Sequence, residues 1–196
     1  IYTFLNKNLS LLKLNNKKTI YSFPNYGPVT FDHYSYNSLR HAGIVSDRFD
    51  DDSYKFAIAR CPYDRAVSLF YYLKQLGKIN KDLCFEGFLN LVHKSRPPIG
   101  LYNSTGISQA NPQCDWLIDN DNGIIVDDIF KLEELEVFIK TMEEKYKIRN
   151  AKIEKLNQSL RDESRAKLLQ NSACIELIEL IYARDFDVLG YKKKKD

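Results

Sequence analysis

The chain has 196 residues, of which 44% are apolar, so length and composition predict one globular domain and exclude a disordered chain. Its net charge is +3, and because the terminal run Lys192–Lys195 carries four positive charges, the rest of the chain sums to −1. This near-neutral balance argues against nucleic-acid binding, and no apolar stretch approaches the roughly 20 residues of a membrane span.

The first part of the chain predicts short elements of mixed type. Apolar residues up to Leu12 share one helical face, which indicates an amphipathic helix already in progress at the first residue. The β-branched and aromatic run Thr19–Phe23 precedes a Pro- and Gly-rich cluster, which predicts a strand and a turn. Residues 29–31 are expected to be extended, and residues 36–42 to form a short helix.

A strand that leads directly into a helix comes next. Tyr54–Ala59 is an apolar run with one charge near its start, as expected of a strand covered on both faces in a parallel sheet. Pro62 suits the first position of a helix and Gly77 its C-terminal stop, so Pro62–Leu76 is predicted to be helical.

The remaining elements complete an α/β pattern. They are a helix over Phe85–His93, a long loop over 95–111, a buried strand over Ile124–Phe130, a helix from Leu132 to Met142 and a last helix that ends by Gly190. We therefore expect an α/β fold with a mostly parallel sheet flanked by helices. Residues 1–191 are predicted to form a single domain and residues 192–196 a basic tail.

Neither disulfides nor metal sites are indicated. The four cysteines lie at positions 61, 84, 114 and 174, which matches no zinc-site spacing and favours thiols. Asp127 and Asp128 are adjacent on a predicted strand, so their side chains point to opposite faces and do not make a metal pair.

The segment Arg60–Ser68 is the best candidate for chemistry. Arg60 follows the buried strand, where its guanidinium can present a fork of donors to a phosphate or sulfate. Ser68 lies six residues into the next helix, roughly 9 Å along its axis, and would contact a ligand on the helix flank beside Arg60. In the alternative interpretation, Arg60 and Arg65 pair with acidic neighbours such as Asp64, and Ser68 only packs.

The string FAIARCPYDRAVSLFYYL resembles the 3′-phosphate-binding segment of the Golgi-type carbohydrate sulfotransferases and their bacterial relatives, which carry Arg-x-Pro-x-x-Arg-x-x-Ser after a strand. The stretch NPQCDWL, followed by GIIVDDIFKLEEL, and the closing LIELIYARDFDVLGY are similar to the same family in order and spacing. Together these stretches span most of residues 54–191.

The resemblance implies a P-loop-like three-layer fold that binds 3′-phosphoadenosine 5′-phosphosulfate (PAPS) and transfers its sulfuryl group to a hydroxyl, usually on a sugar. It assigns the cofactor's 3′-phosphate to Arg60 and Ser68 and implies no metal. Catalysis is expected to come from in-line positioning, a general base and cationic stabilisation of the leaving phosphate.

One part of the family's cofactor site does not occur in the printed sequence. The Lys-containing, Gly/Ser/Thr-rich loop that wraps the 5′-phosphosulfate would directly precede the first helix, which begins near Ile1. Two interpretations stay open: an enzyme whose loop lies outside the numbered chain, or a non-catalytic relative that keeps only an anion site. A P-loop kinase or NTPase is disfavoured because no Gly-x-x-x-x-Gly-Lys-Ser/Thr motif occurs.

His33 is the candidate general base, because an imidazole titrates near neutrality and can accept a proton from a sugar hydroxyl. It also lies where the uronyl 2-O-sulfotransferases of this family carry a catalytic histidine. The expected partner is a carbohydrate or similar hydroxyl acceptor, with no nucleic acid and no membrane contact from the printed chain. A bacterial or viral enzyme would be cytoplasmic, whereas a eukaryotic one with an upstream anchor would lie in the Golgi lumen.

Overall fold

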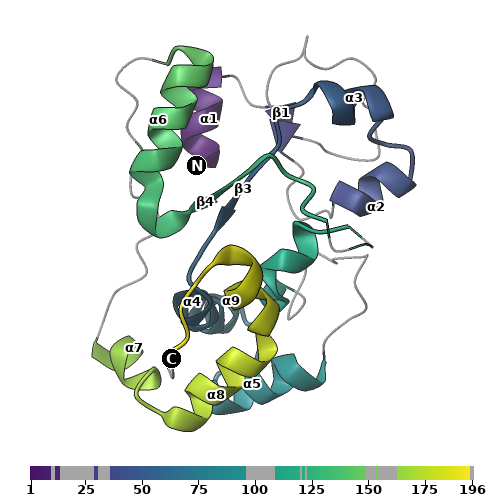
Figure 1. Cartoon of the computed structure of the whole chain (residues 1–196). Helices are drawn as coiled ribbons and strands as arrows, with labels where there is room; N and C mark the ends of the chain where they lie inside the picture. Colours follow the sequence, from purple (N-terminus) through teal and green to yellow (C-terminus); the bar gives the residue numbers. More distant parts are fainter. Residues whose placement is uncertain are drawn as a thin grey trace. The chain divides into compact units, whose positions relative to one another are not determined.

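The computed structural model describes residues 1–9, 12–13, 29–30, 36–95, 109–119, 121, 123–148, 153 and 163–194. These residues belong to two compact units, one formed by Ile1–Ile58 with Trp116–Leu156 and the other by Ala59–Asp115 with Asn157–Asp196. Figure 1 labels most of the helices and strands of both units. Within the described ranges no helix is long and apolar enough to cross a membrane. The single domain predicted over residues 1–191 stays a prediction.

The first unit combines short strands with helices. Strand β1 (Leu12–Lys13) pairs in parallel with β2 (Val29–Thr30), so that Leu12 lies opposite Val29 and Lys13 opposite Thr30. Strand β3 (Phe56–Ala59), whose last residue already belongs to the second unit, is hydrogen-bonded to β4 (Asp128–Lys131). The described helices are α1 (Tyr2–Leu9), α2 (Tyr36–His41), α3 (Asp47–Asp52), the 3₁₀ turn η3 (Leu132–Glu134) and α6 (Leu135–Tyr146).

Aromatic side chains fill the main core of this unit. The fully buried ring of Phe138 lies 5.8 Å from that of Phe4 and 5.3 Å from those of Phe56 and Phe130, measured between centroids. Met142, one turn further along α6, is equally buried. The apolar stripe predicted for the first helix therefore meets, in one core, the stripe predicted for the helix from Leu132 to Met142. A smaller cluster comprises Tyr36, Leu39, Val45 and Phe49.

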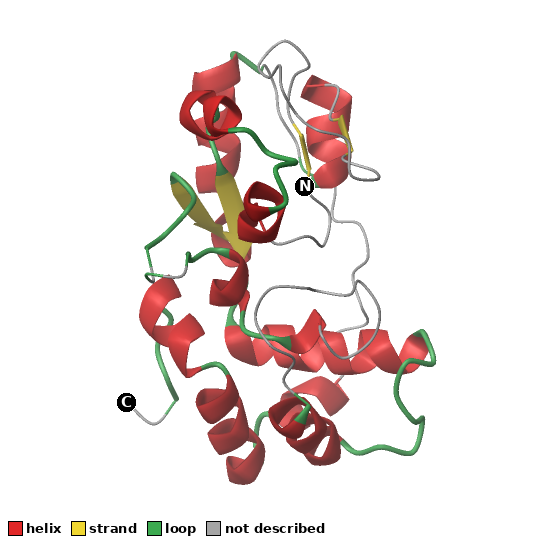
Figure 2. Cartoon of the chain, turned by 90° about the vertical axis from the view of Figure 1, so that its right-hand side faces the viewer, coloured by secondary structure: helices red, strands yellow, loops and turns green. Residues whose placement is uncertain are grey.

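The secondary structure described in the second unit is helical apart from Ala59, the last residue of β3; Figure 2 shows the helices in red. Its elements are α4 (Pro62–Gln75), α5 (Phe85–Lys94), the 3₁₀ turn η2 (Gln113–Trp116), α7 (Glu163–Leu168), α8 (Ser172–Ile181) and α9 (Ala183–Leu189). Its core joins α4, α5 and α8 through buried residues such as Phe70, Phe88 and Ile178. The ring of Phe70 lies 5.5 Å from that of Phe88.

Helix α4 begins and ends where the sequence predicts. Pro62 is its first residue. Asp64 lies in the first turn, where its negative charge interacts favourably with the positive end of the helix dipole. Gly77 follows the helix with φ of 64°. The Gly77 N–H donates to the carbonyl of Lys74 at 3.0 Å, and the Lys78 N–H donates to that of Leu73 at 2.9 Å. These two bonds form the glycine-terminated Schellman motif, which fixes the end of α4.

The α/β class is confirmed, with short two-stranded sheets and helices in the described residues. The P-loop-like three-layer arrangement stays a prediction. Strand β3 is less buried than expected, because three of its four residues are only half-buried. The strand predicted over residues 19–23 lies outside the described residues.

Three predicted boundaries were wrong. The strand expected from Ile124 begins at Asp128, and Ile124 itself is 54% exposed and makes only an isolated bridge to Ile118. The last helix divides at Tyr182, whose φ of −108° separates α8 from α9. The first helix ends at Leu9, so Leu12 lies in β1 instead. Helix α3 was not expected, although Ser46 caps it by accepting a hydrogen bond from the Phe49 N–H at 3.2 Å.

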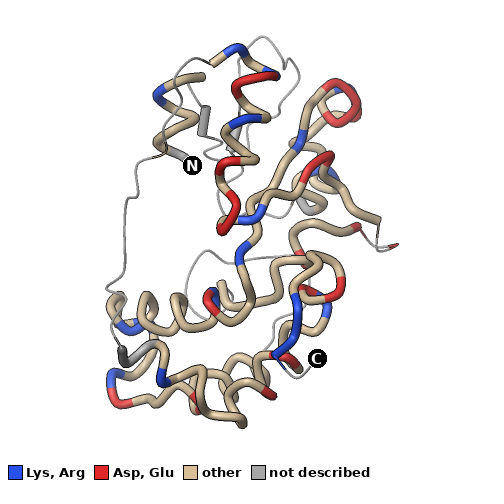
Figure 3. The backbone as a smooth tube through the Cα atoms, turned by 60° about the vertical axis from the view of Figure 1, so that its left-hand side comes forward, with Lys and Arg blue, Asp and Glu red and all other residues tan. Residues whose placement is uncertain are grey.

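Charged residues of both signs are interspersed along the described backbone (Figure 3), in keeping with the near-neutral balance. The start of the basic tail is bound to the second unit. The Lys194 N–H donates to the Tyr63 hydroxyl at 2.9 Å, and its ammonium donates to the Leu169 carbonyl at 3.2 Å. The Tyr63 hydroxyl in turn donates to Glu179. Burial is the main cause that raises the pKa of Tyr63, and this hydrogen bond raises it further.

Candidate functional site

Arg60 is the first residue after β3, and its backbone is held on both sides. Its N–H donates to Oε1 of Gln113 at 2.8 Å, and Nε2 of Gln113 donates to its carbonyl at 2.8 Å. One side-chain amide thus satisfies the two backbone groups that a neighbouring strand would otherwise pair. The half-buried Arg60 guanidinium forms an ion pair with no carboxylate in the described part of the chain.

Gln113 is itself fixed by a buried carboxylate. Oδ2 of Asp185 accepts from the Gln113 N–H at 2.9 Å and from Gln113 Nε2 at 3.3 Å, and Oδ1 accepts from the Cys114 N–H at 2.9 Å. Asp185 is fully buried in α9. Burial of the Cys114 thiol raises its pKa, and the negative charge of the nearby Asp185 carboxylate raises it further. The thiol is therefore protonated at neutral pH.

Arg65 and Ser68 lie one turn apart on α4, at a spacing that places them on one helix face. Nη2 of Arg65 donates to the Gln109 carbonyl at 2.7 Å, and its guanidinium lies 5.7 Å from the centre of the Tyr182 ring. The half-buried Ser68 hydroxyl forms no hydrogen bond with any described residue. No ion pair joins Arg60 or Arg65 to Asp64 or another acidic residue in the described part of the chain, and the packing role that the alternative gives to Ser68 is not tested.

Two buried donors near this segment have no hydrogen-bond partner among the described residues. They are Nη1 of Arg65 and Nδ2 of Asn111, a side chain that is only 1% exposed. A buried donor without an acceptor costs about 1–3 kcal/mol. Arg60, Arg65 and Ser68 all belong to one compact unit, and guanidinium and hydroxyl groups are donor types that phosphate oxygens accept from.

His33 lies outside the described residues, so the structure does not test its role as a base. The other two histidines are described. Nδ1 of the exposed His41 forms a 2.8 Å hydrogen bond with the Asn37 carbonyl, and His93 lies in the last turn of α5. Asn37 also donates to the Ile118 carbonyl at 3.0 Å, which ties α2 to the segment before β4.

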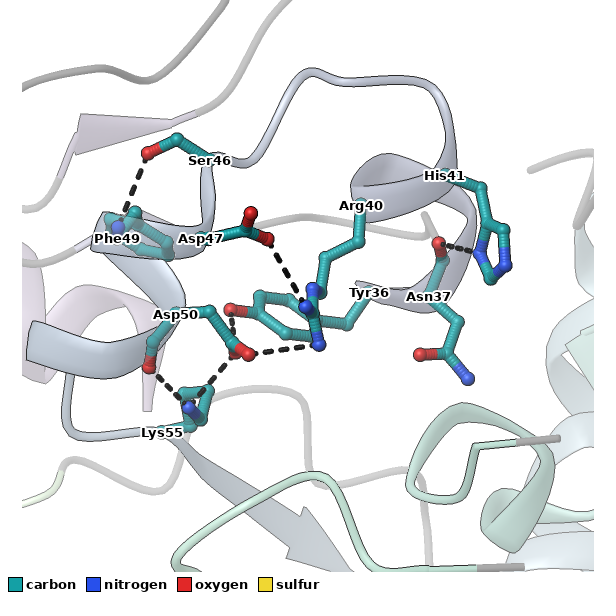
Figure 4. A network of polar contacts seen from close by, with 9 residues as sticks. All are labelled: Tyr36, Asn37, Arg40, His41, Ser46, Asp47, Phe49, Asp50 and Lys55. Carbon is teal, nitrogen blue, oxygen red and sulfur yellow. Dashed lines mark hydrogen bonds and ion pairs between the residues drawn. The ribbon is translucent and has the colours of Figure 1, made fainter. Parts of the chain in front are cut away.

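The helices that follow His33 in sequence are joined by a polar network around Asp50 (Figure 4). Its Oδ1 accepts from the Tyr36 hydroxyl at 2.6 Å and pairs with the Lys55 ammonium at 3.0 Å. Its Oδ2 pairs with Arg40 at 2.9 Å, and Arg40 also contacts Asp47 at 3.3 Å. Burial alone would raise the pKa of Asp50, but the bonds from Tyr36 and Lys55 outweigh it and lower that pKa.

The adjacent residues Asp127 and Asp128, the second of which begins β4, each accept a hydrogen bond from the segment that leads into β3. Oδ2 of Asp127 accepts from the Lys55 N–H at 2.6 Å, and Oδ2 of Asp128 accepts from the Tyr54 hydroxyl at 2.6 Å. None of the four cysteines forms a disulfide. Within the described ranges no group of His, Cys, Asp and Glu side chains is arranged to hold a metal ion.

Sequence reasoning identified Arg60 and Ser68 but missed the roles of Gln113 and Asp185. The stretches that contain them were noted as NPQCDWL and LIELIYARDFDVLGY. No local signal marks either residue: Gln113 lies between Asn111 and Asp115, and Asp185 lies in a helix that also carries Arg184 and Asp187.

Comparison with known families gives one match. A model described as the sulfotransferase family matches residues 10–192, which is nearly the whole chain. No curated protein and no solved structure matches the chain. The resemblance read from the three sequence stretches is thereby confirmed at the level of the family.

Proposed function

Because the chain belongs to the sulfotransferase family, whose members transfer sulfuryl groups, we propose that PAPS is its donor and that a hydroxyl of a carbohydrate or similar compound is its acceptor. The transfer breaks the bond between sulfur and a phosphate oxygen of the donor and forms one between sulfur and the acceptor oxygen. The proton of the acceptor hydroxyl passes to a base, for which we propose His33.

The observation that supports the proposal most directly is how Arg60 is bonded. Its backbone is fixed by Gln113, while its guanidinium lacks a carboxylate partner among the described residues. An arginine placed in this way at the end of a strand can bind a phosphate through two parallel hydrogen bonds. We assign the 3′-phosphate of the cofactor to Arg60 and to the Ser68 hydroxyl.

The rest of the proposed site follows from the same donor set. The buried Nη1 of Arg65 offers a further N–H within the same unit, and the proposed site contains no metal. The P-loop-like three-layer fold belongs to this proposal. A non-catalytic relative that keeps the anion site is the second candidate, because residues that bind a 3′-phosphate do not by themselves transfer a sulfuryl group.

Calorimetry with two nucleotides tests the cofactor assignment. The chain is expected to bind 3′-phosphoadenosine 5′-phosphate (PAP) more tightly than AMP, because only PAP carries a 3′-phosphate. Arg60→Ala should remove about 1.5–3 kcal/mol of PAP binding, the contribution of a hydrogen bond to a charged group, and Ser68→Ala should remove less.

Arg48→Ala is the matched control, because it removes the same charge from an exposed position in the first unit and should leave PAP binding unchanged. Equal affinities of the unmodified chain for PAP and AMP would overturn the assignment. Turnover of PAPS by the full-length protein then decides between an enzyme and a non-catalytic relative.

A further inference from the structure

The Gln113 amide contacts Arg60 in a way that only one orientation of the amide allows. Nε2 lies within hydrogen-bond distance of two acceptors, the Arg60 carbonyl and Oδ2 of Asp185, whereas Oε1 faces the Arg60 N–H. A carboxylate accepts and does not donate at neutral pH, so the nitrogen must face Asp185 and the oxygen must face the Arg60 N–H.

From this geometry we infer that Gln113 and Asp185 are positioning residues for Arg60. The inference rests on the proposed function, in which Arg60 binds the 3′-phosphate. Asp185 fixes the Gln113 amide, and that amide fixes the plane of the peptide groups on either side of Arg60. The direction in which the guanidinium leaves the backbone is then set before any ligand arrives, which lowers the ordering cost of binding.

The burial of Asp185 supports a dedicated role. Its side chain is fully buried and accepts hydrogen bonds from three N–H groups, two of Gln113 and one of Cys114, and the Cys114 thiol also interacts with it. Taking a carboxylate out of water is costly unless hydrogen bonds compensate it. Here all three bonds go to the segment that holds Arg60, although Asp185 is 72 residues away from Gln113 in sequence.

A purely structural role for Gln113 would have a different consequence. If the Asp185 bonds only fixed η2, loss of the Gln113 amide would lower stability and would weaken PAP and AMP binding alike. If the amide positions Arg60, its loss must act on the 3′-phosphate and must act through Arg60. The preference for PAP over AMP separates the two roles.

The experiment uses Gln113→Met, which keeps the side-chain length and removes both hydrogen bonds to Arg60. Calorimetry should show the preference for PAP over AMP reduced roughly tenfold, as when one charge-assisted hydrogen bond is weakened. In an Arg60→Ala background the same change should have no further effect on that preference, because two residues that act through one contact are not additive.

Hydrogen exchange supplies a readout that needs no nucleotide. The Arg60 amide should exchange slowly in the unmodified chain and faster in Gln113→Met. Asn171→Ala is the control, because it removes a 2.9 Å capping bond to Ala173 in the same unit without contacting Arg60. It should lower stability but change neither the exchange at Arg60 nor the nucleotide preference.

The outcomes separate the inference from the proposed function. An unchanged preference in Gln113→Met, together with its loss in Arg60→Ala, would overturn the positioning role and leave the phosphate assignment intact. Equal binding of PAP and AMP by the unmodified chain would overturn both. If Gln113→Met does not fold, Asp185→Asn replaces it, since an amide cannot accept from all three N–H groups; an unchanged preference there overturns the inference equally.

Discussion

Asp50 shows how one residue can hold a local structure. Its carboxylate accepts a hydrogen bond from the Tyr36 hydroxyl and forms ion pairs with Lys55 and Arg40. Only 18% of its side chain is exposed. Its pKa is lowered in the folded state, so folding favours the deprotonated form. The stability that results is present above the unfolded pKa of about 3.9 and is lost as the pH falls through the lower folded value.

Asp50→Asn is expected to destabilise the protein by about 1–3 kcal/mol at neutral pH, because two partly buried cations lose their carboxylate. The difference from the unmodified chain should shrink as the pH falls from the unfolded pKa of about 3.9 through the lower folded pKa of Asp50. Urea unfolding at a series of pH values measures both effects. Asp52→Asn, at an exposed pair with Arg48, should cost under about 1 kcal/mol. A stability of Asp50→Asn equal to that of the unmodified chain at pH 7 would contradict this account.

Whether a candidate site residue can be predicted depends on how far along the sequence its contact partners lie. Arg60 and Ser68 could be predicted because a strand, a proline and a helix follow one another within a single segment. Gln113 and Asp185 could not, because their roles depend on contacts 53 and 72 residues apart that no local pattern encodes. Helix α9 also carries Arg184 and Asp187, so its sequence does not single out Asp185 as the buried charge.

Among the elements, α4 depends most clearly on a local signal. Gly77 has φ of +64° and nothing within 4 Å of where a Cβ would lie, so a substitution there is strained by its backbone alone. Gly77→Ala is expected to lower the free energy of unfolding by about 1–2 kcal/mol, the cost of left-handed backbone for a residue with a Cβ. Gly77→Asn should cost less, since Asn tolerates this conformation. Thermal unfolding of both variants checks the order, and equal losses would show that the backbone is not the cause.

Helices α8 and α9 show why other boundaries were missed. The apolar spacing from Ile175 to Tyr182 continues without a glycine or proline, so the sequence indicates one helix. The chain nevertheless bends at Tyr182, whose hydroxyl donates to the Ala110 carbonyl at 2.7 Å and whose ring lies under the Arg65 guanidinium. Contacts with distant segments thus determine this bend. Asp185 lies in the helix that begins after it.

At the scale of the whole molecule, cofactor binding and turnover should respond to different residues. The proposed phosphate ligands, Arg60 and Ser68, belong to the second unit together with the Gln113 and Asp185 pair behind them. The proposed base, His33, occurs in sequence well before that segment and is not needed to bind a phosphate. Changes near Arg60 should therefore alter nucleotide affinity, whereas a change at His33 should alter the rate of transfer.

His33→Ala in the full-length protein is expected to lower kcat by about 10²–10⁴-fold, the usual contribution of a general base, and to leave PAP affinity nearly unchanged. His41→Ala and His93→Ala are the controls, because His41 is exposed on α2 and His93 lies at the end of α5. Sulfate transfer from labelled PAPS measures kcat, and calorimetry measures PAP affinity. Full activity in His33→Ala would exclude it as the base, whereas a parallel loss of PAP affinity would indicate a binding or structural role. A loss of kcat alone would place proton removal at His33 and would show that this step is separable from cofactor binding.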